Sequence, residues 1–199
     1  IYASYSIGNK EPNRNDYVES SPNSRPQHET LHDLELGYKL VKYNTILSVN
    51  LYNMMYDNQL VLTGQINDVG AYTRTNVDNS FRRGIEIEGK QKLFNKLQIQ
   101  ANLTLSQNII NEYVEYVDNW DTWGQEQIVH KSTDLAFSPN VIWATQFNYK
   151  LSENLSLDIN SKYVGEQYID NTSSLDRKLD DYLTHNLQLQ YNLNSKLFK

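Results

Sequence analysis

The sequence contains no cysteine, so it can form neither a disulfide framework nor a thiolate metal site. It also lacks any apolar run near the roughly 20 residues that a membrane-spanning helix needs. These absences exclude a helical membrane protein but not a transmembrane β-barrel, in whose strands apolar and polar residues alternate. The formal net charge of -6 gives a nucleic-acid partner no electrostatic support. With four prolines and eight glycines in 199 residues, the composition also argues against a disordered or collagen-like chain.

The common catalytic motifs are missing as well. The four histidines are scattered without the H-E-x-x-H spacing of zinc proteases, and no serine lies in a G-x-S-x-G context. We therefore predict no enzyme activity, no metal site and no cofactor. Four carboxylates near the middle of the chain have the chemistry of a cation site, but their spacing fits no known ligand loop, and we interpret them as solvated charges. They are Glu115, Asp118, Asp121 and Glu126.

The chain does contain a long amphipathic hairpin between Phe81 and Ile110. Apolar and polar residues alternate along both arms, as in strands with one apolar and one hydrated face. The arms exceed the usual strand of about 5–6 residues and match the roughly 9–11 that a tilted strand needs to cross a bilayer. A short polar turn is expected at Asn95 and Lys96. One face is predicted to point to lipid (Ile85, Ile87, Leu97, Ile99, Leu103) and the other to a lumen (Glu86, Glu88, Lys90, Gln98, Gln100, Asn102).

The same alternation recurs on both sides of this hairpin. Long loops are expected at residues 8–29, 111–138 and 166–181, and a partly irregular segment at 59–79. Short turns are expected between the strands at the opposite end. Besides the hairpin arms, strands are predicted at residues 1–7, 30–41, 44–57, 140–151, 155–165 and 182–193.

This arrangement predicts an all-β protein with an antiparallel up-and-down meander. Short turns at one end and long loops at the other are typical of outer-membrane barrels and unusual in soluble β-proteins. Because both chain ends look cut inside strands, at Ile1 and at Leu197–Lys199, we interpret residues 1–199 as part of a larger barrel. Such a part is expected to close on itself, to curl into a partial sheet or to pair with copies of itself, since a flat sheet leaves its edges open. The strand-end aromatics that suit an interfacial girdle are Tyr38, Tyr43, Trp143, Tyr149, Tyr163, Tyr182 and Tyr191.

The segment W-D-T-W-G and its surroundings form the most binding-like stretch. Exposing two tryptophans is costly, and aromatic side chains on loops can stack on sugars or flat ligands. The alternative is that these rings pack beneath their own loop. The candidate ligand-binding residues are Tyr113, Tyr116, Trp120 and Trp123.

A second group of candidates is basic. Arg82 and Arg83, with Arg74 upstream, have the charge to line a lumen. We favour a structural role for the adjacent pair, namely cross-strand ion pairs with Glu86 or Glu88.

Several segments, taken in order, resemble the barrel of TonB-dependent outer-membrane receptors. They span nearly the whole chain, and their order and spacing carry the resemblance rather than any one of them. Two departures are Glu11, where arginine is usual, and two residues inserted between Pro26 and Glu29. The matching segments are Ile1 to Asn13, Pro26 to Lys39, Asn50 to Gln59, Asn76 to Glu88 and Tyr163 to Asp170.

The resemblance implies the C-terminal part of a barrel of about 22 strands, with the plug domain and the energy-coupling box elsewhere in the parent protein. It implies contact with outer-membrane lipid in a Gram-negative bacterium and active import of a scarce, bulky nutrient, most often a ferric siderophore. Energy would come from the TonB–ExbB–ExbD complex. No ligand contact can be transferred to a particular residue, because the loops of the family vary. Two alternatives remain, a passive porin-like or adhesin barrel and a soluble lipocalin-like ligand binder.

Overall fold

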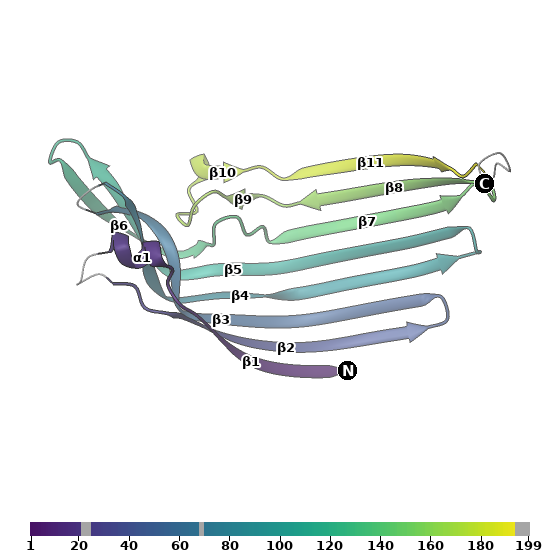
Figure 1. Cartoon of the computed structure of the whole chain (residues 1–199), viewed down its shortest axis with the longest axis horizontal. Coiled ribbons are helices and arrows are strands. Elements are labelled where there is room, and N and C mark those ends of the chain that lie inside the picture. Colours follow the sequence, from purple (N-terminus) through teal and green to yellow (C-terminus); the bar gives the residue numbers. More distant parts are fainter. Residues whose placement is uncertain (21–24, 68–69, 194–199) are drawn as a thin grey trace.

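The computed structural model describes residues 1–20, 25–67 and 70–193, most of which lie in one curved antiparallel sheet (Figure 1). The elements are β1 (Tyr2–Lys10), α1 (Arg14–Glu19), β2 (Glu29–Lys42), β3 (Thr45–Ile66), β4 (Tyr72–Leu93), β5 (Leu97–Asn119), β6 (Gly124–Asp134), β7 (Val141–Lys150), β8 (Leu155–Val164), β9 (Gln167–Tyr168), a 3₁₀ turn (Leu175–Arg177), β10 (Lys178–Leu179) and β11 (Tyr182–Tyr191). The strand order β1-β2-β3-β4-β5-β7-β8-β11 confirms the predicted meander. No helix of this described part is long and apolar enough to cross a membrane.

Three strands are longer than the sequence predicted. β3 and β4 contain 22 residues each and β5 contains 23, so residues 59–66 and 72–79 of the segment expected to be partly irregular, and much of the loop expected at 111–138, are strand. Apolar and polar residues do not alternate regularly along these extensions, so periodicity did not reveal them as strands. The register between β3 and β4 shifts between Leu62 and Ile66, around Gly64, whose φ of 81° is easily adopted only by glycine.

β5 has two different partners along its length. Leu97 to Leu105 pairs with β7, whereas Ile109 to Asn119 pairs with β6. β6 therefore leaves the path of the sheet and forms a separate hairpin with β5 at the long-loop end (Figure 1). Among the described residues, this branch and the separate two-stranded sheet of β9 and β10 depart from a simple meander.

The loop expected at 8–29 is only partly loop. β1 continues to Lys10, and α1 follows because Asn13 begins it with a capping box. The Asp16 amide donates to Asn13 Oδ1 at 3.0 Å, and the Asn13 amide donates to Asp16 Oδ2 at 2.8 Å. Arg74 Nε lies 3.8 Å from Asp16 Oδ1, which ties α1 to β4. The strand start expected at Leu197–Lys199 lies outside the described residues.

Cross-strand pairing gives the sheet one apolar and one polar face, as predicted for the hairpin. Ile87 pairs with Val49 and with Leu103, and Leu103 pairs in turn with Trp143. On the polar face, Glu88 pairs with Asn102.

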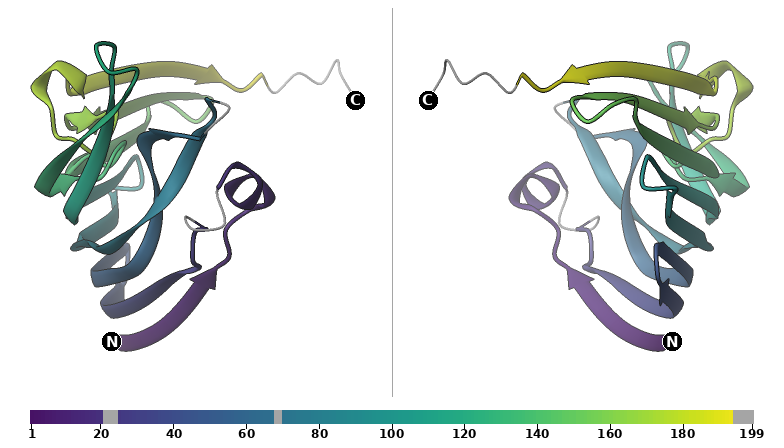
Figure 2. Two further views of the ribbon diagram at one scale, coloured as in Figure 1. Left: turned by 90° about the vertical axis from the view of Figure 1, so that its left-hand side faces the viewer. Right: turned by 90° about the vertical axis from the view of Figure 1, so that its right-hand side faces the viewer.

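Two tyrosines of the polar face reach across a neighbouring strand. Tyr2 Oη donates to Asn50 Oδ1 at 2.9 Å, and the Tyr52 hydroxyl lies over Gly84 on the neighbouring strand, towards Ser106. Such contacts between alternate strands indicate that the polar face is the concave side of the curled sheet (Figure 2). The two outer strands, β1 and β11, form its edges.

Most of the predicted girdle residues that lie in strands are on the apolar face. Trp143 stacks on Tyr163 with ring centroids 6.1 Å apart near the long-loop end. Tyr149 pairs with Leu97 near the short turns. Tyr182 is an exception, because it pairs with Val164 and so lies on the polar side.

The buried core lies at the long-loop end rather than in the middle of the sheet. It forms where the β3–β4 extension meets the β5–β6 hairpin and the segment after β6. Its members are Val61, Val77, Ile110, Tyr113 and Leu135.

Candidate functional site

A chamber of about 750 Å³ opens beside this core. Its walls are the β3–β4 extension, the β5–β6 hairpin, the segment after β6 and part of residues 166–181. Cationic and aromatic side chains line it together, including Arg74, Arg82, Arg177, Tyr72 and Tyr116. The chamber therefore depends on four segments that are far apart in the sequence.

Tyr113 joins the chamber to the core. Its side chain is only 3% exposed, and its hydroxyl donates to the Leu62 carbonyl at 3.0 Å. Burial, helped by the charges of Asp170 and Glu115, raises the pKa of Tyr113 to about 12. The phenol consequently stays protonated at neutral pH and holds β5 against β3.

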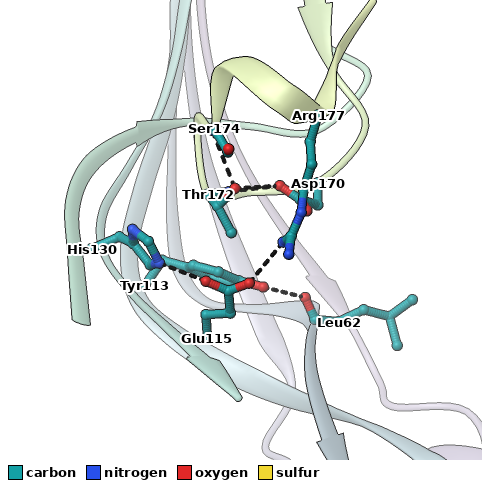
Figure 3. Close-up of polar contacts among 8 residues, drawn as sticks. All are labelled: Leu62, Tyr113, Glu115, His130, Asp170, Thr172, Ser174 and Arg177. Atoms are coloured by element: carbon teal, nitrogen blue, oxygen red, sulfur yellow. Dashed lines mark hydrogen bonds and ion pairs between the residues drawn. The ribbon is translucent and has the colours of Figure 1, made fainter. Parts of the chain in front are cut away.

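An ion network closes one side of the chamber (Figure 3). Arg177 Nη1 lies 2.7 Å from Glu115 Oε1 and 2.8 Å from Asp170 Oδ2. These carboxylates, Glu115 first, raise the pKa of the Arg177 guanidinium, so it remains charged. His130 Nε2 lies 2.9 Å from the second oxygen of Glu115. Glu115 thus connects β6 to the segment 166–181.

The Asp170 carboxylate is held from its own loop as well. Thr172 Oγ1 donates to Asp170 Oδ1 at 2.7 Å, and the Ser174 amide donates to Thr172 Oγ1 at 3.2 Å (Figure 3). Burial pushes the pKa of Asp170 upward, but the Thr172 hydrogen bonds and Arg177 outweigh it, so the pKa lies below its usual value. Asp170 is therefore ionised at neutral pH.

The expected ion pairs of Arg82 and Arg83 with Glu86 or Glu88 are wrong. Arg82 Nη1 donates to Ser138 Oγ at 2.8 Å, and Arg83 on the opposite face donates to Gln107 Oε1 at 3.0 and 2.6 Å. Four residues along one strand span about 13 Å, too far for a pair between Arg82 and Glu86. Within the part of the chain that the structure describes, no carboxylate pairs with Arg82, so its charge is available to the chamber.

The four candidate ligand residues separate into two pairs. Tyr113 and Tyr116 line the chamber. Trp120 and Trp123 lie at the tip of the β5–β6 hairpin, 73% and 85% exposed, and do not pack beneath their loop. Sequence reasoning missed Arg177 as a chamber residue, because its position follows only from the folding of residues 166–181 onto β5 and β6.

Three of the four central carboxylates have other partners. Asp118 Oδ1 accepts from Gln125 Nε2 at 2.9 Å, Glu126 is bonded to Asn119, and Glu115 belongs to the ion network. Across residues 1–20, 25–67 and 70–193, no group of three or more histidine, aspartate or glutamate side chains is arranged to hold a metal ion.

An antiparallel wall with one apolar and one polar face, and a chamber between long hairpins at one end, defines part of a receptor-type membrane barrel. Residues 1–198 match the family described as TonB dependent receptor-like, beta-barrel. The chain therefore belongs to this family, and the resemblance found in the sequence is confirmed.

Solved structures show the same fold. The siderophore receptor PiuA from Acinetobacter baumannii superposes with a TM-score of 0.74 at 17% identity, over 96% of this chain and 27% of that one. A mutant of the ferric enterobactin receptor PfeA from Pseudomonas aeruginosa gives 0.64 at 18% identity, over 98% and 30%. The copper transporter OprC gives 0.71 at 14% identity, over 97% and 29%. The chain thus spans less than a third of these receptors. No curated protein sequence matches it.

Proposed function

We propose that the chain is part of the wall and mouth of an outer-membrane receptor that imports a bulky metal chelate, with a ferric siderophore as first candidate. Family membership supports the receptor barrel. The ligand is inferred from the similar structures, two of which are described as siderophore or ferric enterobactin receptors and one as a copper transporter. The three descriptions name a siderophore, ferric enterobactin and copper.

The two faces of the sheet support an orientation in the outer membrane. The apolar face exposes large side chains such as Leu36, Leu51 and Leu187, at 49%, 46% and 71%. Such a continuous surface is stable against hydrocarbon and unfavourable in water. The apolar face then contacts lipid and the polar face lines the lumen. The turn at Asn95 and Lys96 faces the periplasm, and the chamber faces outward.

The observation that carries the ligand class is Arg82. Its guanidinium lines the chamber and is bonded to a neutral serine, whereas Arg177 is already neutralised by two carboxylates. Ferric siderophores bind iron through anionic oxygens, which an arginine recognises well. Tyr113 and Tyr116 add ring surface for the organic part of the chelate. A role for Trp120 and Trp123 in binding the same ligand stays a prediction.

Import against a gradient needs an energy source. We propose coupling to the TonB–ExbB–ExbD complex through the plug and energy-coupling box of the parent protein. The alternatives are a passive porin-like or adhesin barrel and a soluble lipocalin-like binder. They differ in whether uptake requires TonB and in whether the protein fractionates with the outer membrane.

The test measures uptake of radiolabelled ferric catecholate, ferric hydroxamate, haem, cobalamin and copper in cells lacking the parent gene and in cells carrying it. For the chelate that is imported, Arg82→Gln should weaken binding roughly 10- to 100-fold, because a charge-assisted hydrogen bond contributes about 1.5–3 kcal/mol. The matched control is Arg83→Gln. Arg83 lies on the opposite face, over the Phe81 ring at 4.7 Å, and its loss should leave affinity unchanged.

Two results would contradict the proposal. Uptake that persists without TonB would favour a passive barrel. Equal affinities of the Arg82→Gln and Arg83→Gln variants would show that the chamber is not the binding site.

A further inference from the structure

The tip of the β5–β6 hairpin carries an aromatic pair that the chamber does not use. The rings of Trp120 and Trp123 lie edge to face with centroids 6.2 Å apart, and both side chains are largely exposed. The hairpin projects outward at the long-loop end (Figure 1). Exposed tryptophan surface is unfavourable in water, and tryptophan is enriched where proteins hold partners.

The tip presents this pair rigidly. Asn119 Oδ1 accepts the amides of Asp121 at 2.9 Å and of Thr122 at 3.1 Å, which fixes the turn. Trp123 adopts φ 55°, in the left-handed region that a bulky residue rarely occupies. A glycine or asparagine would satisfy the turn with less strain, so the turn alone does not explain a tryptophan here.

The hairpin is also braced against the neighbouring one. Gln125 Nε2 donates to Asp118 Oδ1 at 2.9 Å and to the Gly64 carbonyl at 3.0 Å. The Ile66 amide donates to Gln125 Oε1 at 3.2 Å. A partner that meets the tip therefore finds a surface that is already ordered, which lowers the entropic cost of binding.

The charge around the pair selects the kind of partner. At the tip itself, residues 117–127 contain three carboxylates (Asp118, Asp121 and Glu126) and no lysine or arginine. Asp121 lies between the two tryptophans in sequence, and its carboxylate has neither a hydrogen bond nor an ion pair within the described chain. The faces of tryptophan rings attract ammonium and guanidinium groups, and a nearby carboxylate strengthens that attraction. A neutral saccharide would gain nothing from this charge.

We propose that the Trp120–Trp123 tip docks a cationic polypeptide, a lysine- or arginine-rich segment of another protein. Cationic side chains stack on the exposed ring faces, and Asp121 and Glu126 supply the opposite charge. This surface is separate from the chamber and goes beyond the import function.

The experiment titrates fluorescein-labelled nona-arginine with the purified full-length receptor in detergent micelles and follows anisotropy. The Trp120→Ala/Trp123→Ala variant should bind roughly tenfold more weakly, since each cation–π contact contributes about 0.5–1 kcal/mol at an exposed site. The Tyr43→Ala/Phe94→Ala variant is the matched control. It removes two aromatic side chains that are 94% and 91% exposed at the opposite end, and it should bind as the unmodified protein does.

A charge variant keeps the test decisive if the double alanine variant does not fold. Asp121→Asn should weaken nona-arginine binding and reduce its sensitivity to salt, whereas Asp176→Asn, at an exposed position in another loop, should not. Unchanged affinity in either the tryptophan or the Asp121 variant would overturn the proposal. So would tryptophan-dependent binding of maltoheptaose in place of nona-arginine. Uptake of the metal chelate, measured in parallel, reports on the chamber alone.

Discussion

The same three strands, β3, β4 and β5, pass through two regions that are stabilised differently. Towards the short turns they form a single layer, and each side chain faces either the apolar or the polar surface. Towards the long loops they pack against other segments. Within the described residues, every buried apolar side chain lies at that second end: Leu60, Val61, Val77, Ile110, Tyr113, Leu135 and Val164.

The difference shows that the apolar face of the sheet depends on its surroundings, whereas the loop end supplies its own core. A single layer gains hydrophobic stabilisation only when hydrocarbon covers it. The loop end instead buries apolar side chains within protein and fixes them with the Arg177 network. The chamber should therefore keep its shape when the lipid changes.

The largest effect is expected at Ile110, the fully buried side chain of the core, where a substitution tests whether the two regions are stabilised differently. Ile110→Ala should lower the free energy of unfolding by about 2–4 kcal/mol, because it removes packed methylenes and leaves a cavity. Ile87→Ala, on the apolar face, should cost less, since detergent or lipid can fill the space. Urea unfolding in micelles measures both. Equal costs would mean that the two regions are stabilised alike.

A second prediction uses alkaline pH. The raised pKa of Tyr113, about 12 against about 10 in the unfolded chain, means that the folded state holds its proton more tightly. The protonated phenol therefore contributes about 2–3 kcal/mol to the free energy of unfolding. This contribution is complete below pH 10 and is lost as pH rises towards 12. The free energy of unfolding, measured from pH 9 to 12, should therefore fall more steeply for the natural protein than for Tyr113→Phe. Parallel curves for the two proteins would show that Tyr113 is not buried.

The third prediction sharpens the picture of the single layer. A Cβ on Gly84 would lie 2.4 Å from the Leu105 carbonyl oxygen and 2.8 Å from Tyr52 Oη, whereas nothing lies within 4 Å of one on Gly89. Gly84→Ala should cost about 1–3 kcal/mol because strand or tyrosine must shift. Gly89→Ala should be neutral or stabilising, because it reduces the freedom of the unfolded chain. Unfolding free energies of the two variants give the answer. A harmless Gly84→Ala would show that the sheet is loosely packed there.

The smallest effect concerns the Arg177 network, in which Glu115 and Asp170 bind Arg177 and so anchor residues 166–181 to β5. Arg177→Gln should lower the free energy of unfolding by about 1 kcal/mol, because the ion pair of Arg177 with Glu115 is partly exposed. It should also speed hydrogen exchange in residues 166–181. Lys178→Gln, which removes only the pair with Glu166, should not change exchange there.

Acid should act on the same anchor. The pKa of Asp170 is lower in the folded state than in the unfolded chain. Its contribution to stability is therefore present above the usual aspartate pKa of about 3.9 and is lost as pH falls through the lower pKa of the folded state. Exchange in the segment should rise in that range and not at neutral pH. An anchor that weakened well above that range would show that Asp170 does not hold it.

The sheet could be predicted from the sequence because its two faces meet different surroundings, so that residues such as Ile85 and Glu86 alternate in polarity. The extensions of β3, β4 and β5 could not, because segments such as 112–118, E-Y-V-E-Y-V-D, do not alternate apolar and polar residues with the period of two that identifies a strand. Arg82 was recognised as a candidate lining residue, but its partner was not, since Ser138 reaches it only after β6 has folded back. Arg177 had no sequence signal of its own.

The branch at β5 gives the protein a modular architecture. In the wall, β5 pairs with β7 as far as Leu105 and Val141. The pairing of β5 with β6 begins only beyond that point, at Ile109. Within the described sheet β6 pairs with β5 alone, so the tip between Asn119 and Gly124 can change in length and composition without altering the order or register of the wall strands. Such a hairpin can be exchanged between receptors, in evolution or by engineering, to alter what is recognised outside while the barrel stays the same.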